Sequence, residues 1–137
     1  MPNIIKFEVV TDTGSYGTDG KVYLGLGGRE FRLNSGVDDF IANSAPTTFV
    51  FGLGSTVNNS PDNDPRSPFP LTTENVDKYP IYIRFEPSSD TDIWTLASVT
   101  VSIFTTTTAV KTYGGLAGTG IYLILGARST KRFDFGS

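Results

Sequence analysis

Short runs in which apolar and polar residues alternate recur along the whole chain, as in IIKFEVV (4–10) and SVTVSIF (98–104). Alternation with a period of two is typical of strands that bury one face of a sheet. Helical periodicity is hard to find in any segment. The pattern predicts strands at 4–10, 21–26, 30–33, 47–53, 80–86, 98–104, 108–113, 121–125 and 131–135. Many short strands separated by turn residues indicate an all-β sandwich or barrel.

The stretch 55–79, STVNNSPDNDPRSPFPLTTENVDKY, interrupts this rhythm. It is rich in Pro, Asn, Asp and Ser, and it carries almost no strand signal. A structureless segment of this length is uncommon inside a compact domain. Two interpretations stay open, namely a functional loop and an insertion that the surface tolerates.

Length and composition indicate one domain over residues 1–137, with enough hydrophobic residues (38%) to bury a core. The net charge of −3 opposes a non-specific grip on nucleic-acid phosphates, so no nucleic-acid partner is expected. No run of about 18 apolar residues occurs, so no transmembrane segment is expected. The start, MPNIIKFEVV, has no signal-peptide pattern. We expect a cytoplasmic or peripheral membrane protein, or a secreted one if a leader has been removed.

The chain contains no cysteine and no histidine. Disulfides and thiolate metal sites are therefore excluded, as are Ser-His-Asp and Cys-His catalytic arrangements and most zinc sites. Asp38 and Asp39 are adjacent, and neighbours along a strand point to opposite faces, so this pair cannot flank one scissile bond. We therefore expect a protein that is not an enzyme.

Outside 55–79, acidic residues gather in three predicted loops, 11–20, 34–40 and 87–93. Because antiparallel strands reverse direction, these loops are expected to meet at one end of a sandwich. Carboxylate and carbonyl oxygens from several loops suit a hard cation such as calcium. The alternative stays open that Asp and Asn are here simply good turn residues. Asp19 is expected to tie its own loop to neighbouring backbone by hydrogen bonds.

Three motifs follow one another along the chain: a TG turn and G-T-D before a Val/Tyr-rich strand within 7–26, D-D-F at 38–40, and W-x-L-x-x-V-x-V at 94–101. In this order they resemble the PLAT domain, also called LH2, of lipoxygenases, pancreatic-type lipases, polycystins and a clostridial phospholipase C toxin. The resemblance implies an antiparallel β-sandwich of two four-stranded sheets, calcium in loops at one end, and catalysis left to a partner domain. The segment 55–79 is the main departure from the family pattern.

The resemblance also implies which residues would hold calcium, through side chains or carbonyl oxygens. These residues are Ser15, Gly17, Thr18, Asn34, Ser35, Val37, Asp38, Asp39, Asp92 and Ile93. Ser15 and Asn34 stand where the calcium-binding toxin has an acid, and the loss of charge weakens the sites that they would complete. The site that includes Asp38 and Asp39 is therefore the better candidate for calcium.

Apolar loop residues beside such a site would contact a membrane surface or a protein partner. The residues expected in this role are Tyr16, Phe69, Ile93 and Trp94, although Trp94 is also expected to be partly buried. The predicted function is a non-catalytic binding module that docks through the loops at one end of the sandwich, assisted by calcium. The alternatives are a carbohydrate-binding or lectin-like module with an exposed aromatic platform, and a toxin-associated structural component that assembles through its Thr-rich strands.

Overall fold

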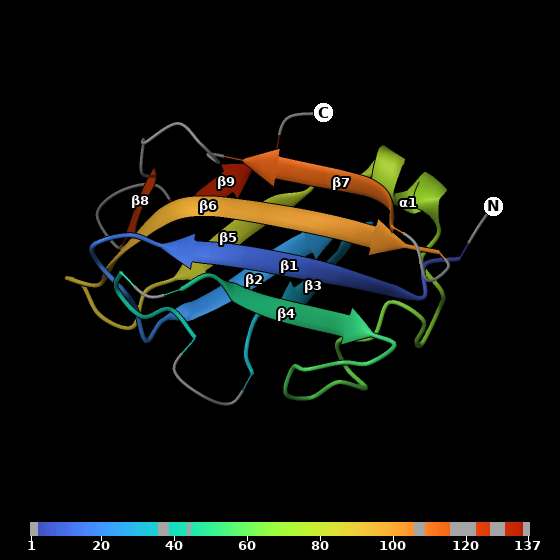
Figure 1. Ribbon diagram of the computed structural model, residues 1–137, viewed down its shortest axis with the longest axis horizontal. Helices are drawn as coiled ribbons and strands as arrows, with labels where there is room; N and C mark the ends of the chain where they lie inside the picture. The colour runs from blue at the N-terminus through green and yellow to red at the C-terminus, as the bar shows by residue number, and fades with distance from the viewer. Residues whose placement is uncertain are drawn as a thin grey trace.

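The computed structural model describes residues 3–35, 39–43, 45–105, 109–115, 123–126 and 131–135. Two antiparallel sheets lie face to face, and the helix α1 (Thr73–Lys78) lies at one end of them (Figure 1). The first sheet has the order β4 (Thr47–Gly52), β1 (Lys6–Thr13), β6 (Ile93–Phe104) and β7 (Ala109–Gly115), and β8 (Leu123–Gly126) also pairs with β6. The second sheet has the order β3 (Arg29–Arg32), β2 (Lys21–Leu26), β5 (Tyr82–Glu86) and β9 (Arg132–Asp134).

The nine strands predicted from alternation are all present, with ends displaced by a few residues. The all-β fold of two antiparallel sheets is confirmed, but the prediction of four strands in each sheet is wrong, because the first sheet has five. The cause is the length of β6, which has 12 residues. On its edge opposite β1, Val99–Phe104 pairs with β7 and Ile93–Leu96 pairs with β8.

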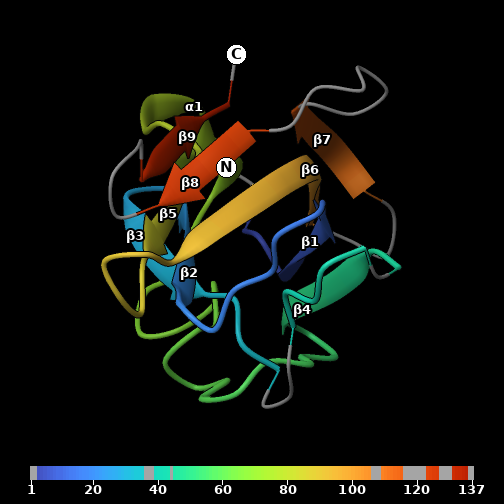
Figure 2. The same ribbon diagram turned by 90° about the vertical axis from the view of Figure 1, so that its left-hand side faces the viewer.

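The strand β8 closes one side of the sandwich. Although it belongs to the first sheet, it contacts β5 of the second sheet. In Figure 2, β8 is drawn in front of β9, the strand that follows it in the chain and that pairs with β5. The chain therefore passes from one sheet to the other along this side.

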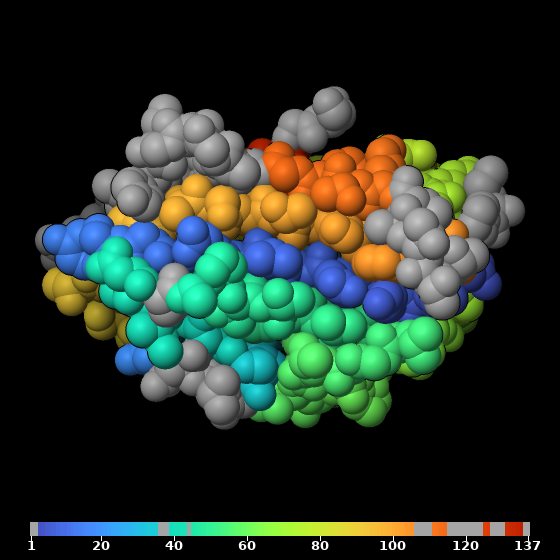
Figure 3. Space-filling view, viewed as in Figure 1, coloured from blue at the N-terminus to red at the C-terminus, as the bar shows by residue number. Residues whose placement is uncertain are grey.

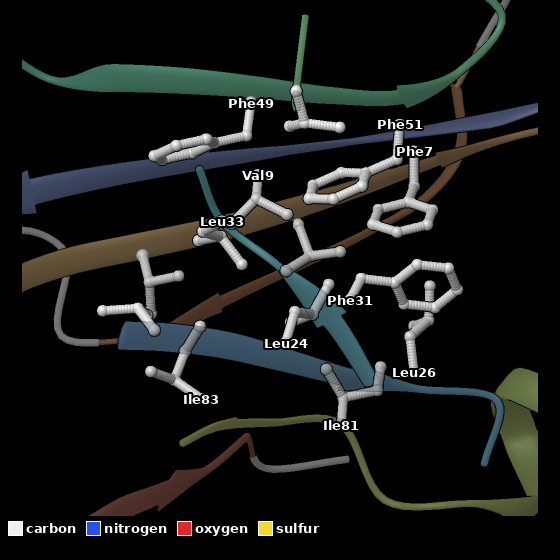
Figure 4. Packing of buried hydrophobic residues seen from close by; sticks show 14 of the residues in the cluster. Phe7, Val9, Leu24, Leu26, Phe31, Leu33, Phe49, Phe51, Ile81 and Ile83 are labelled. Atoms are coloured by element: carbon white, nitrogen blue, oxygen red, sulfur yellow. The ribbon is translucent and has the colours of Figure 1, made fainter. Parts of the chain in front are cut away.

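Side chains from both sheets form an apolar core (Figure 4). On β1, Phe7 and Val9 point inward because alternate residues of a strand share a face. The Phe7 ring stacks on Phe51 with 4.5 Å between centroids, and the Phe31 ring meets Phe7 edge-on at 4.8 Å. Such aromatic pairs are favoured beyond the burial of their area. Phe49 and Phe51, alternate residues of β4, are also fully buried.

The segment 55–79 is fastened to the sandwich at several points. Val57 and Leu71 are buried in the core. The buried Asn63 side chain accepts a hydrogen bond from the backbone N–H of Arg32 at 2.9 Å, which satisfies the outer edge of β3 at that residue. The segment therefore contributes to the core and protects a sheet edge, which a simple surface insertion would not do.

The same segment contains α1, so the expectation of no helix is wrong there. Thr72 is its N-cap and forms a capping box with Asn75, in which each side chain accepts a hydrogen bond from the other's backbone N–H. Val76 is the buried residue of the helix. A helix of 6 residues is too short to show a repeating apolar stripe, which explains why the periodicity did not predict it.

Candidate functional site

Three loops meet at the end of the sandwich where β1 ends and β6 begins, and Thr18 joins them. Its backbone N–H donates to the carbonyl oxygen of Phe40 at 3.0 Å. Its hydroxyl donates to the carboxylate of Asp92, 2.7 Å from the nearer oxygen, and accepts from the N–H of Gly20 at 2.8 Å. The predicted meeting of the loops 11–20, 34–40 and 87–93 is therefore confirmed by the described residues. We call residues 14–20, 33–35, 39–43 and 87–93 the loop end, which lies at the left of Figures 1 and 3.

Asp92 fastens its own loop as well as Thr18. Its carboxylate accepts from the backbone N–H of Ser88 at 2.8 Å and from the Ser88 hydroxyl at 3.0 Å. Together with the Thr18 hydroxyl, these are three donors on one carboxylate. The observed role of Asp92 is thus to hold the 87–93 loop against the 14–20 loop.

Asp39 closes the next loop in a similar way. It is nearly buried, and its carboxylate accepts from the backbone N–H of Ser35 at 2.9 Å and, at short range, from the Ser35 hydroxyl. Its own carbonyl oxygen accepts from the hydroxyl of Thr47 at 3.0 Å. A carboxylate at this depth needs such donors, because burial otherwise disfavours the charged form.

The beginning of the first loop is held by Thr95 of β6. The N–H of Tyr16 donates to the hydroxyl of Thr95 at 2.9 Å, and the N–H of Thr95 donates to the carbonyl of Tyr16 at 3.0 Å. The backbone also packs closely against the 39–43 loop, since a Cβ added at Gly17 would lie 2.3 Å from the carbonyl oxygen of Phe40. The glycine is therefore required by this approach of two backbones.

Two shallow hollows flank Thr18 and Asp19. The first has a volume of about 120 Å³ and is lined by Lys21, Arg32 and Asp39 among others. The second has a volume of about 370 Å³ and is lined by Asp92 together with Ser88, Ser89, Ile41 and their neighbours. Thr18, Asp19 and Phe40 line both hollows, so they form the ridge between them.

Asp19 does not tie the loop as predicted. Its side chain is exposed and makes no hydrogen bond within the described residues. The bond to neighbouring backbone comes instead from Thr18, whose hydroxyl accepts from the N–H of Gly20. The reason is geometric, since the hydroxyl already lies between Gly20 and Asp92, and Asp19 is left on the outer side of the turn.

The predicted calcium ligands are only partly brought together. Val37 and Asp38 lie outside the described residues. Asp39 and Asp92 line different hollows, and each already accepts hydrogen bonds from a serine. Within the described ranges no group of three acidic, histidine or cysteine residues is placed to hold a metal ion. The described donors alone therefore do not make a calcium cage, and calcium binding stays a prediction that depends on the rest of the 34–40 loop.

The remaining predicted ligands differ in their exposure. Ser15 is exposed on the first loop, and Asn34 lines the first hollow. Ile93 is the first residue of β6, directly after Asp92. These positions agree with a loop end that offers oxygen atoms to solvent, but they do not converge on one point.

Of the predicted contact residues, two lie together at the loop end. Tyr16 is 59% exposed and Ile93 is 42% exposed. The structure adds Ile41, which is 51% exposed and lines the second hollow. In the sequence, Ile41 is an apolar residue that directly follows D-D-F in a turn-rich stretch. That position could have indicated an exposed apolar side chain, but the motif ends at Phe40 and does not include it.

Phe69 is 80% exposed, but it lies at the opposite end of the sandwich. It lines a hollow with the β2–β3 turn at Gly27 and Gly28 and with Tyr79, next to α1. We call the β2–β3 turn, residues 53–54, 64–72 and α1 with Tyr79 the helix end. Because β2 runs from one end to the other, Phe69 cannot share a flat contact surface with Tyr16.

Trp94 is a core residue, so its predicted contact role is wrong. Its side chain is fully buried, and its ring lies against Phe40 and Phe85 with centroid distances of 5.0 and 5.8 Å. The indole N–H donates to the hydroxyl of Thr13 at 3.0 Å. The polar atom of the indole is thus satisfied inside the protein, which removes the usual reason for a tryptophan to reach the surface.

The outer face of the second sheet carries a row of arginines that sequence reasoning missed. Arg32, Arg84 and Arg132 lie in one cross-strand row with Tyr23. Arg84 donates twice to Glu30, at 2.8 Å in each case, and this bond holds the pKa of Glu30 below its usual range. Arg32, beside the loop end, has no carboxylate partner within the described residues. The row could be found in the sequence only by knowing the register of the strands.

No family model, curated protein or solved structure matches this chain. The resemblance to the PLAT domain therefore rests on the three sequence motifs alone. It supports a proposal about function and does not assign a family.

Proposed function

We propose that this protein is a non-catalytic docking module that binds a membrane surface through its loop end. The observation that carries the proposal is the exposure of three large apolar side chains, Tyr16, Ile41 and Ile93, at the loop end, where Ile41 lines one of two polar hollows. Apolar side chains that project beside polar groups suit the boundary between lipid headgroups and acyl chains.

The loops that carry these side chains are already held in place. Hydrogen bonds of Thr18, Asp39, Asp92 and Thr95 join each loop to a neighbouring loop or strand. Little conformational entropy is then lost when the loop end binds, which favours affinity. Transfer of each apolar side chain from water contributes roughly 1–2 kcal/mol, so three of them need additional polar contacts to anchor the protein.

Calcium assistance is a separate part of this proposal. A calcium ion between the 34–40 loop and an anionic headgroup would reduce the repulsion expected for a protein of net charge −3. Among the described residues, no helix has the length and apolar character that crossing a bilayer requires. Binding would therefore be peripheral for this part of the chain.

The carbohydrate-binding alternative has less support. Its planar platform would need free aromatic rings, yet Trp94 is buried. On the outer sheet face, the guanidinium of Arg84 lies 4.3 Å from the Tyr23 ring and that of Arg132 lies 3.9 Å from the Tyr82 ring. Tyr23 and Tyr82, the aromatic residues of this row, are therefore covered by cations and do not offer a free ring to a sugar.

Co-sedimentation with phosphatidylcholine vesicles, with and without one-fifth phosphatidylserine, tests the proposal. The double variant Tyr16→Ser/Ile93→Ser should lose most of the bound fraction, while Leu53→Ser/Phe69→Ser, which removes apolar exposure at the helix end, should keep it. Equal loss in both variants, or binding by neither parent nor variant, contradicts docking through the loop end. Parallel samples with calcium or with EDTA, for the parent protein and for Asp39→Asn, test whether calcium assists binding. If calcium does not change the bound fraction of the parent protein, calcium assistance is contradicted.

A further inference from the structure

The two hollows of the loop end lie side by side and differ in the charges that line them. The first is lined by both cations and acids, Lys21 and Arg32 with Asp19 and Asp39. The second is lined by Asp19 and Asp92, and no basic residue is among the described residues that line it. Because Thr18 and Asp19 line both, a ligand on the ridge would reach both hollows.

Lys21 and Arg32, like Lys78, have no carboxylate partner within the described residues, and these two line the same hollow. Arg84 is bound by Glu30 and Glu86, and Arg66 is bound by Asp64. In a chain with more acids than bases, two cations left without partners on one hollow are available to an anionic ligand.

The acids in the first hollow show that a simple anion is not the best fit. Asp39 lines it, although the two hydrogen bonds from Ser35 offset its charge. Asp19 is exposed and makes no hydrogen bond within the described part of the chain. An inorganic anion would be repelled by Asp19, and a bare dication would be repelled by Lys21 and Arg32.

The volumes of the two hollows suit two different chemical groups of one ligand. The first, at about 120 Å³, has room for about four water molecules, which is comparable to a phosphate group. The second, at about 370 Å³, offers hydroxyls of Ser88 and Ser89 and the apolar surface of Ile41 beside its acids. Carboxylates next to an apolar side chain suit an alkylated ammonium group, which has both charge and methyl or methylene surface.

We propose that the paired hollows bind a phosphoalkylammonium group, with the phosphate between Lys21 and Arg32 and the ammonium beside Asp19 and Asp92. This inference rests on the proposed membrane docking and names its headgroup class, the zwitterionic phosphocholine or phosphoethanolamine group. It requires no calcium.

The first test is a titration of the full chain with soluble phosphocholine in EDTA, followed by amide chemical shifts. The shifts should concentrate at residues 18–21 and 32–34. Lys21→Gln and Arg32→Gln should each weaken binding about tenfold, because each removes a charge-assisted bond. Lys78→Gln, an equal change of charge at the helix end, is the matched control and should leave the affinity unchanged.

Two further probes separate a zwitterion from its parts. Inorganic phosphate and choline alone should each bind at least tenfold more weakly than phosphocholine, because each fills one hollow only. Asp19→Asn should weaken phosphocholine and leave inorganic phosphate unchanged or slightly tighter. Equal affinity for phosphate and phosphocholine, absence of phosphocholine binding, or unchanged affinity in Lys21→Gln and Arg32→Gln overturns the inference.

The same variants on phosphatidylcholine vesicles distinguish this inference from the docking proposal. Suppose that the parent protein binds vesicles, that Tyr16→Ser/Ile93→Ser abolishes this binding, and that Lys21→Gln/Arg32→Gln does not. This result supports docking through the loop end and contradicts the headgroup site. If soluble phosphocholine binds as described but vesicles do not, then the site stands and its source is a soluble phosphoalkylamine. Loss of vesicle binding in both double variants supports the two together.

Discussion

Among the described residues, the loop end and the helix end expose three large apolar side chains each, but they differ in how the charges beside their hollows are paired. Tyr16, Ile41 and Ile93 are exposed at the first, and Leu53, Phe69 and Tyr79 are exposed at the second. At the helix end, Arg29 is the charged residue among the described lining of the Phe69 hollow and is held internally, although Lys78 has no carboxylate partner among the described residues. Arg66 binds Asp64 at 2.9 Å, Arg29 donates to the Asp64 carbonyl at 3.1 Å, and the Lys78 ammonium lies 5.8 Å from the Tyr79 ring.

At the loop end, Lys21, Arg32 and Asp19 lack such partners within the described residues. Apolar exposure alone would therefore rank the two ends equally. The state of the charges distinguishes them, because charges without partners beside a preformed hollow retain their capacity to bind a ligand. Under the proposed docking, the less exposed Ile41 and not Phe69, the most exposed of these side chains, lies on the binding surface.

The largest expected effect concerns the support beneath the loop end. Trp94→Ala should lower the free energy of unfolding by about 3–5 kcal/mol, because it leaves a cavity against Phe40 and Phe85. Phe69→Ala at the helix end should change it by less than about 0.5 kcal/mol, since that side chain is exposed. Denaturant unfolding compares them. A similar loss in both variants contradicts the burial described for Trp94.

The second prediction concerns stability and the close approach of two backbones at the loop end. Gly17→Ala places a Cβ against the carbonyl of Phe40 and should destabilise by about 1–3 kcal/mol. Gly114→Ala on β7 meets nothing within 4 Å and should be neutral or slightly stabilising. Thermal unfolding of the two variants gives the comparison, and a neutral Gly17→Ala means that the two loops do not touch as described.

A third prediction concerns the hydroxyl that joins the loops. Thr18→Val keeps the shape but removes the donor to Asp92 and the acceptor for the N–H of Gly20, at a cost of about 1–2 kcal/mol. Amide hydrogen exchange should quicken at Gly20 and Ser88 and not at the helix end. Thr112→Val is the control, because the exposed Thr112 hydroxyl makes only a long hydrogen bond, at 3.3 Å, with the half-buried Ser102 among the described residues. Unchanged exchange at Gly20 contradicts the role given to Thr18.

The smallest effect on stability is expected at the row of arginines on the outer face of the second sheet. Arg84→Gln should return the pKa of Glu30 towards its ordinary value and cost less than about 1 kcal/mol, because the pair is partly exposed. Since the folded-state pKa of Glu30 is lowered, its contribution is present above the ordinary pKa and is lost as pH falls through the folded value. Carboxyl titration by NMR checks this, and a Glu30 pKa that is the same in parent and variant refutes it.

The sequence was a good guide where one local property decides the structure. Period-two alternation located the strands, and the reversal of antiparallel strands predicted that the three loops would meet. It failed where long-range pairing decides. Nothing near β6 indicates that its two halves pair with different strands, and nothing near Trp94 indicates that Thr13 satisfies its N–H.

The candidate site was harder still to predict. The acids were visible as motif members, but their hydrogen bonds to Ser35 and Ser88 depend on the loop conformations. Lys21 and Arg32 lie on neighbouring strands and become notable only because other arginines are paired and they are not. The absence of a partner is a property of the folded surface, so no local pattern reports it.

Docking through the loop end can be tested with single labelled cysteines, because the chain has no cysteine of its own. A single cysteine, introduced as Ile93→Cys at the loop end or as Phe69→Cys at the helix end, carries an environment-sensitive fluorophore. On addition of phosphatidylcholine vesicles, the label at position 93 should shift to the blue and become inaccessible to an aqueous quencher, while the label at position 69 should not change. A shift at position 69 without one at position 93 would contradict docking through the loop end.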